Sequence, residues 1–143
     1  DYGDLPDITL GTGMNDFRTL RDQNGPRHSI PVTPLLYLGK LIDSEADGQP
    51  TENSDGDDED MIEDDEDGII FLTPLAPGNT SQIAFSGTNN TADVATLYMY
   101  ADWENDGIMV PVPLTLDTIG AGMTVAGQIA EFTVPITATF EQG

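Results

Sequence analysis

Residues 95–103 read ATLYMYADW, and this stretch sets the expectation for the fold. Apolar side chains stand at alternate positions from Leu97 to Ala101, while Tyr98 and Tyr100 fall on the opposite face of an extended chain. This period of two is typical of a half-buried β-strand. Further strand-length runs stand at residues 35–38, 69–72, 81–85, 109–116 and 128–134. About six strands spaced about ten residues apart predict an all-β protein, an antiparallel β-sandwich of the immunoglobulin or jelly-roll kind.

Turn and breaker residues refine this prediction. Residues 87–90 (Gly-Thr-Asn-Asn) are predicted to form a turn, and the prolines at 111 and 113 confine the run 109–116 to a sheet edge or a bulge. Residues 1–34 are predicted to form a long irregular arm, in which only Asn15 to Arg21 suits a helical turn. The run 35–38 suits a buried strand. We also expect core packing for the large aromatic side chains in strand-like runs: Tyr37, Tyr98, Tyr100 and Trp103.

Composition limits the classes of function. The 143 residues include 26 acids and 4 Lys or Arg, so the formal net charge is −22 and no nucleic-acid partner is expected. The sequence has no apolar run of about 18 residues, which predicts no membrane insertion. It also has no Cys, which excludes disulfides, thiol nucleophiles and Cys-based metal sites. Stability must therefore come from elsewhere, and a hard metal ion is the obvious candidate.

The acids are concentrated in one segment. Fourteen of them lie between residues 43 and 67, whereas all four cations lie within the first 40 residues, so salt bridges cannot neutralise the segment. We predict a single domain over 1–143, with the arm at 1–34, an acidic metal loop at 43–67 and the main strands at 68–143.

Two motifs have the ligand spacing of a calcium loop. Asp43, Glu45 and Asp47 precede Gly48, and Asp102-x-Glu104-x-Asp106-Gly107 repeats the pattern. Carboxylates at positions 1, 3 and 5 with Gly at 6 match the first half of an EF-hand loop, but neither motif has the Glu at position 12, so the remaining ligands must come from elsewhere. The run Asp64–Gly68 is a natural donor. This density of carboxylates favours Ca2+ over Mg2+, and the alternative is a solvated acidic loop that only confers solubility.

The sequence gives little support to catalysis. His28 has no Ser or Cys nucleophile motif near it, and the carboxylates are too many and too clustered to single out one acid and one base. We therefore predict a non-enzymatic protein. Two glycosylation sequons on predicted turns, starting at Asn79 and Asn89, suggest extracellular exposure.

Eight short motifs occur along the chain: DYGDLPD (1–7), GPRH (25–28), LYLG (36–39), DSEADGQP (43–50), DGDD (55–58), DEDG (65–68), DWENDG (102–107) and FTVP (132–135). Together they resemble the GEVED domain of secreted and surface-anchored bacterial proteins. The resemblance spans nearly the whole chain and implies an extracellular, calcium-associated β-sandwich with no established enzymatic activity. It makes the following residues ligand candidates: Asp1, Asp4, Asp43, Glu45, Asp47, Asp55, Asp57, Asp65, Glu66, Asp67, Asp102 and Asp106.

The chain departs from the family at two places. Ile108-Met109-Val110 follows the second loop where the family usually has an acidic Gly-Glu element, and the chain stops at Gly143 where family modules usually continue into a further strand. The second departure predicts an open sheet edge that a neighbouring subunit completes. We therefore expect a homopolymeric subunit of a bacterial surface fibre that assembles by strand donation. The alternative is an adhesin or carbohydrate-binding module of a larger secreted protein, with glycans as partners, and hydrolysis by the acidic cluster is a weaker third.

Overall fold

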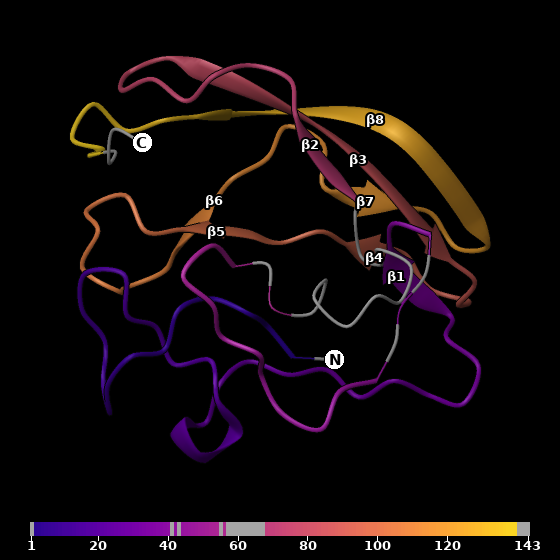
Figure 1. Ribbon diagram of the computed structural model, residues 1–143. Coiled ribbons are helices and arrows are strands. Elements are labelled where there is room, and N and C mark those ends of the chain that lie inside the picture. Colours follow the sequence, from indigo (N-terminus) through magenta and orange to yellow (C-terminus); the bar gives the residue numbers. More distant parts are fainter. Residues whose placement is uncertain (1, 41, 43, 55, 57–67, 140–143) are drawn as a thin grey trace.

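The computed structural model describes residues 2–40, 42, 44–54, 56 and 68–139. These residues form an all-β sandwich with antiparallel strands, which confirms the predicted fold class. Figure 1 shows one sheet above, two short ladders beneath it and the N-terminal arm below both. The strands are β1 (Leu36–Leu38), β2 (Ile69–Phe71), β3 (Thr80–Asn89), β4 (Ala95–Thr96), β5 (Met99–Ala101), β6 (Val110–Val112), β7 (Thr118–Ile119) and β8 (Met123–Thr133).

The upper sheet is built around β3. One edge of β3 pairs with β8 along the whole strand, and the other edge pairs first with β2 and then with β1. The register shifts between Phe85 and Gly87, where the Gly127 N–H donates to the Ser86 hydroxyl at 3.0 Å, as in a β-bulge. The turn predicted at 87–90 is wrong, because β3 continues through Asn89. A Cβ on Gly87 would lie 2.9 Å from the Tyr37 carbonyl oxygen, so this glycine permits close packing of β1 rather than a turn.

The lower layer consists of two short ladders, β5 with β6 and β4 with β7. The predicted strand at 95–103 is therefore split in two, and β7 was not predicted. Pro111 lies in β6, within a two-stranded ladder, which confirms its edge position. Leu97 and Met99 pack against the core as the alternation predicts, whereas Tyr98 and Tyr100 are 72% and 56% exposed, so core packing of these two tyrosines is wrong.

Phe132 of β8 joins the two layers. The Trp103 ring stacks on it with centroids 6.4 Å apart, and Phe71 of β2 meets it edge-on at the same separation. Ala130, Phe132 and Val134 are buried while Ile129 is 54% exposed, which confirms the alternation predicted for 128–134. The buried hydrophobic side chains of the described residues are Ile83, Phe85, Trp103, Val112, Ile119, Ala130, Phe132, Val134 and Ala138.

Asn89 makes a polar connection between the layers. Its side chain is fully buried, and its amide NH2 donates to the carbonyl oxygens of Asp93 at 2.8 Å and Ile119 at 2.9 Å. Its carbonyl oxygen accepts the N–H and the hydroxyl of Thr91. Asn89 is therefore not on an exposed turn as predicted, and its buried amide is closed to glycan attachment. Asn79, the other sequon residue, lies on an exposed turn.

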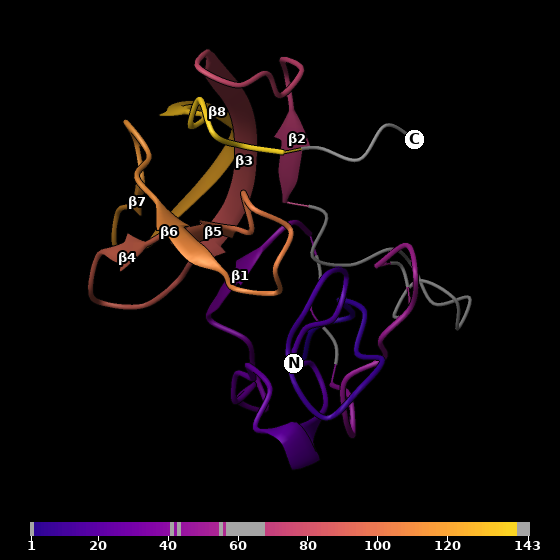
Figure 2. The ribbon, with the colours of Figure 1, turned by 90° about the vertical axis from the view of Figure 1, so that its left-hand side faces the viewer.

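The arm has little regular structure. Its one helical element in the described part is the 3-10 turn Arg21–Gln23, so the helical turn predicted over Asn15–Arg21 is wrong. Asn15 has φ 51°, a left-handed conformation that interrupts a helix. Figure 2 shows the arm under the sandwich, to the side of the two ladders. The strand β1 that follows is not buried as predicted, since Leu36 is 50% exposed.

Candidate functional site

The loop after β5 carries one predicted ligand set. The Asp102 carboxylate accepts the N–H groups of Glu104 and Asp106 at 3.2 Å on Oδ1 and that of Gly107 at 2.7 Å on Oδ2. Asp106 Oδ1 accepts the Ile108 N–H at 3.0 Å. These bonds fold the loop around its own first carboxylate. The aspartate carboxylates of this DxExDG motif therefore accept hydrogen bonds from backbone N–H groups of the same loop.

Oxygen lone pairs remain on this loop. An ionised carboxylate offers about four acceptor sites, and the bonds above use three on Asp102 and one on Asp106. Asp102, Glu104 and Asp106 line a hollow of about 230 Å³ together with Thr137. Since Ca2+ needs six to eight oxygens, this loop alone supplies too few, although carboxylate oxygen is the right donor type.

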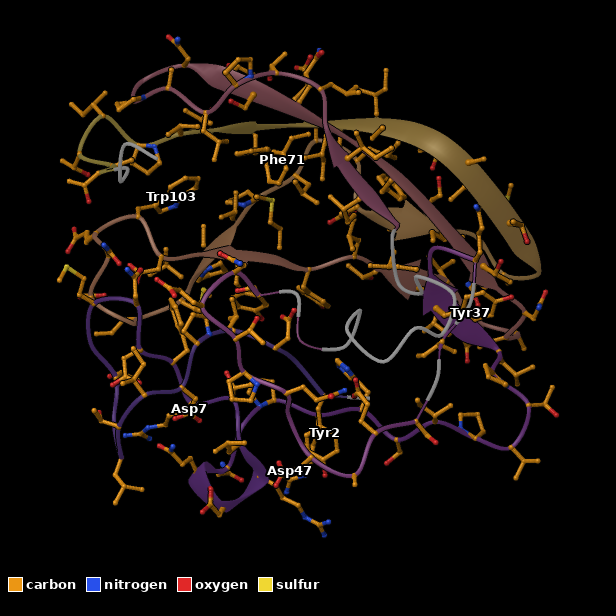
Figure 3. The ribbon with its side chains drawn as sticks, viewed as in Figure 1. Tyr2, Asp7, Tyr37, Asp47, Phe71 and Trp103 are labelled. Carbon is orange, nitrogen blue, oxygen red and sulfur yellow. The ribbon has the colours of Figure 1, made fainter. Side chains whose placement is uncertain are left out.

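The first predicted loop lies in the arm. The Glu45 carboxylate accepts the Tyr2 N–H at 2.6 Å, and Asp47 Oδ1 accepts the N–H groups of Arg21 at 2.7 Å and Gly48 at 2.8 Å. Asp4 is brought near this loop, because its carbonyl oxygen accepts the Thr51 N–H at 3.0 Å. Figure 3 shows Asp47 and Tyr2 low in the arm, apart from Trp103 of the other loop. The two DxExDG motifs therefore do not converge on one point.

Within the described residues, no group of three or more His, Asp or Glu side chains is placed to hold a metal ion. The remaining predicted ligands lie outside the described residues: Asp1, Asp43, Asp55, Asp57, Asp65, Glu66 and Asp67. Calcium binding therefore stays a prediction.

Asp7 and Asp16 were not predicted as functional residues, yet their carboxylates organise the arm. Asp7 Oδ2 accepts the N–H groups of Thr19 and Leu20 at 3.0 Å, and its Oδ1 accepts the Gln23 side-chain amide. Asp7 and Asp47 together therefore accept the three successive N–H groups of residues 19–21, at the start of the 3-10 turn. Figure 3 shows Asp7 and Asp47 beside this turn. Such acceptors satisfy backbone donors that an irregular chain leaves unpaired.

Asp16 does the same nearer the sandwich. It is 7% exposed and accepts the N–H groups of Ile8 at 2.7 Å and Thr9 at 3.2 Å, together with the Thr9 hydroxyl. The Thr9 hydroxyl and then the Ile8 N–H lower the pKa of the Asp16 carboxyl, because these bonds favour the charged form. Its sequence neighbours gave no signal for this role.

The arm meets the sandwich at a tight contact. Gly107 has φ 80°, and a Cβ there would lie 2.5 Å from the Gly13 nitrogen and 2.6 Å from the Asp16 carbonyl oxygen. Asn15 adds a bond, since its N–H donates to the Asn105 side chain at 3.3 Å. We call this contact of loop 102–107 with turn 13–16 the seam. It fixes the acidic loop against the arm.

Strand β2 is an edge strand. It pairs with β3 alone among the described residues. Phe71 lies on the core-facing side, opposite Ile83 and against Phe132, yet it is 54% exposed. Figure 3 shows its side chain directed from β2 toward the space between the layers. The core-facing side of β2 is therefore partly exposed at Phe71.

A groove of about 860 Å³ runs between the arm, β1 and the lower layer. Tyr37, Tyr98 and Tyr100 line it, with His28 at the arm side and otherwise mostly aliphatic residues. Aromatic rings that line a groove of this size are typical of binding sites. Among the predicted core aromatics, Trp103 packs as predicted at 9% exposed, and Tyr37 is half-buried.

No family model, curated protein or solved structure matches this chain. In the part of the chain that the structure describes, no helix is long and apolar enough to cross a membrane.

Proposed function

We propose that the chain is a calcium-stabilised extracellular structural protein, a subunit of a bacterial surface fibre that assembles by adding a strand from another subunit. The observation that carries the assembly step is Phe71, a core-facing side chain that is half exposed on the edge strand β2. An added strand would cover it and would continue the sheet.

Charge supports the role of calcium. The formal net charge of −22 places many like charges close together, and two unit charges about 6 Å apart repel by roughly 1–3 kcal/mol at an effective dielectric between 20 and 80. Divalent cations relieve this repulsion on binding and so favour both folding and association. The alternate carboxylates of loop 102–107, which keep acceptor sites free, supply part of such a site.

The setting of the carboxylates supports a structural role over catalysis. Asp7, Asp16 and Asp47 each accept two or more backbone N–H groups, so they stabilise the backbone conformation of the arm. The extracellular location rests on the resemblance to the GEVED domain, whose members are secreted or surface-anchored.

Assembly and calcium can be tested together. Light scattering, circular dichroism melts and negative-stain microscopy of the purified chain are compared in millimolar Ca2+ and in excess chelator. We expect a higher melting temperature and larger particles with Ca2+. A Ca2+-stabilised monomer contradicts the fibre role, and an unchanged melting temperature contradicts the calcium role.

A second candidate function is glycan binding as an adhesin or carbohydrate-binding module. It is favoured by Tyr98 and Tyr100, whose exposed rings line the groove. Aromatic rings stack on the apolar faces of sugars, and neutral sugars escape the charge repulsion. Calorimetry with neutral oligosaccharides tests this candidate. Glycan binding is supported if Tyr98→Ala and Tyr100→Ala abolish the binding and the exposed-site control Ile129→Ala keeps it. Absence of binding to the wild type removes this candidate.

A further inference from the structure

The backbone of β2 has an outward side and an inward side that the hydrogen bonds define. The Ser86 N–H donates to the Gly68 carbonyl at 2.7 Å, and the Leu72 N–H donates to the Gln82 carbonyl at 2.9 Å. Because the partners alternate in an antiparallel ladder, residues 68, 70 and 72 face β3. The N–H and C=O groups of Ile69 and Phe71 therefore point away from β3, along the edge that no other described strand pairs.

Residues 69–72 themselves lack the sequence features that normally protect an edge. Residues 69–72 are Ile, Ile, Phe and Leu, without a charge, a proline or a bulge. Apolar side chains occupy both faces. Ile70 is 63% exposed on the outer face, where it pairs with Ala84, and Phe71 is 54% exposed on the core face. This edge is suited to pair with another apolar strand.

We propose that the strand added at this edge is β2 of a second copy, antiparallel, with Ile70 opposite Ile70. This inference rests on the proposed function and names the partner at one of its contacts. Because the pairing is two-fold symmetric, it closes a dimer, and growth of a fibre requires a further contact at another surface of the subunit. In this register Ile69 of each copy stands opposite Phe71 of the other, and every outward N–H and C=O group of the two residues is paired. The core-facing Phe71 is then covered by the partner copy's Ile69.

Charge selects the antiparallel direction. Four acids, Asp64–Asp67, immediately precede the strand in the sequence, whereas residues 72–77 carry no charge. Two parallel copies would start from the same end and bring these runs together. Two antiparallel copies start from opposite ends, so the two points at which the acidic runs join β2 are kept apart. Like charges in register across a sheet are unfavourable.

Charge reversal at Ile70 tests the pairing. In a non-hydrogen-bonded antiparallel pair the Cα atoms are only about 4.5 Å apart, so Ile70→Lys or Ile70→Glu opposes two like charges. We expect either variant alone to raise the dissociation constant about tenfold or more, and an equimolar mixture to restore association. Association is measured by sedimentation in Ca2+. Protein concentrations up to about 1 mM are used, because a contact this short is expected to have a high dissociation constant.

Matched controls are available on the same face. Ile129 of β8 flanks Ala84 on the side away from Ile70 and is 54% exposed, so Ile129→Lys and Ile129→Glu make the same changes of net charge away from the β2 edge, on the opposite side of the sheet. They should associate like the wild type. Circular dichroism melts verify that all four variants are folded.

A cross-link gives a second test that does not depend on charge. The chain has no Cys, so Ile70→Cys introduces its single thiol. The proposed Cα separation lies within the range of disulfides. Oxidation should link Ile70→Cys into a dimer and leave Ile129→Cys monomeric.

The outcomes separate this inference from the proposed function. If Ile70→Lys and Ile70→Glu associate like the wild type, the β2 pairing is overturned. The proposed function is kept in that case, because another segment then supplies the added strand. A wild type that stays monomeric at every concentration, with and without Ca2+, overturns both.

Discussion

The sheet of β3 and β8 and the N-terminal arm are stabilised by different interactions. The sheet has a long ladder with one β-bulge and buries Ile83, Phe85 and Phe132. The arm has exposed apolar side chains such as Leu10, at 91%, and its backbone donors are satisfied by carboxylates. The first region depends on apolar burial and the second on ionised oxygen, so temperature and pH should affect them unequally.

The largest effect is expected in the sheet. Phe85 is fully buried, and Phe85→Ala removes its apolar contacts and leaves a cavity. We expect a loss of about 3–5 kcal/mol in the free energy of unfolding, measured by urea denaturation. Phe71→Ala, at the exposed edge, should cost clearly less. Equal losses would contradict the view that the core is centred on β3.

The seam between the two regions provides the next test. Gly107→Ala must keep a positive φ and place a Cβ 2.5 Å from the Gly13 nitrogen. Gly122→Ala is the matched control, since its φ is 67° and nothing lies within 4 Å of its Cβ. We expect about 1–2 kcal/mol for the control from the backbone conformation alone and a larger loss for Gly107→Ala. Similar losses would show that the seam contributes no stability.

Within the arm, Asp7→Ala should release the 3-10 turn. It leaves the N–H groups of Thr19 and Leu20 without their acceptor, at an expected cost of about 1–3 kcal/mol. Hydrogen exchange should accelerate at residues 19–25, while the amides of β3 and β8 stay protected. Asp22→Ala removes the same charge from the exposed side of the turn and should have little effect. If Asp22→Ala accelerates exchange equally, net charge rather than hydrogen bonding controls the arm.

The sequence predicted the fold class and the faces of the strands best where burial alone decides them. Ala130, Phe132 and Val134 are buried because a period of two leaves no other face for the core. Gly87 and Asn89 misled the prediction, since they serve tight packing and a buried hydrogen-bond network instead of a turn. Residue type alone does not distinguish these uses.

The candidate site was less predictable for a related reason. A carboxylate oxygen can bind either a cation or a backbone N–H, and the sequence pattern is the same for both. Glu45 and Asp47 were predicted as ligands and accept backbone donors, while Asp7 and Asp16 were missed although they organise the arm. The exposure of Tyr98 and Tyr100 depends on which ladder face the arm leaves open, which is a tertiary property.

The smallest effect is expected from acid, and it should be confined to the arm near the seam. Because the pKa of Asp16 is lowered from its ordinary value of 3.8, the stability it confers is fully present above that pH and is lost as the pH falls through the lower folded value. Hydrogen exchange at residues 8–16, followed from neutral pH down to acid, should show this loss. Thr9→Val removes the largest cause of the shift, so the loss should be smaller and should be complete at a higher pH, and Asp16→Asn should abolish this part of the pH dependence. A wild-type profile in Asp16→Asn would assign the acid sensitivity to other carboxylates. Loss of the sheet before the arm would overturn the contrast between the two regions, since β3 and β8 pair through peptide groups rather than through carboxylates.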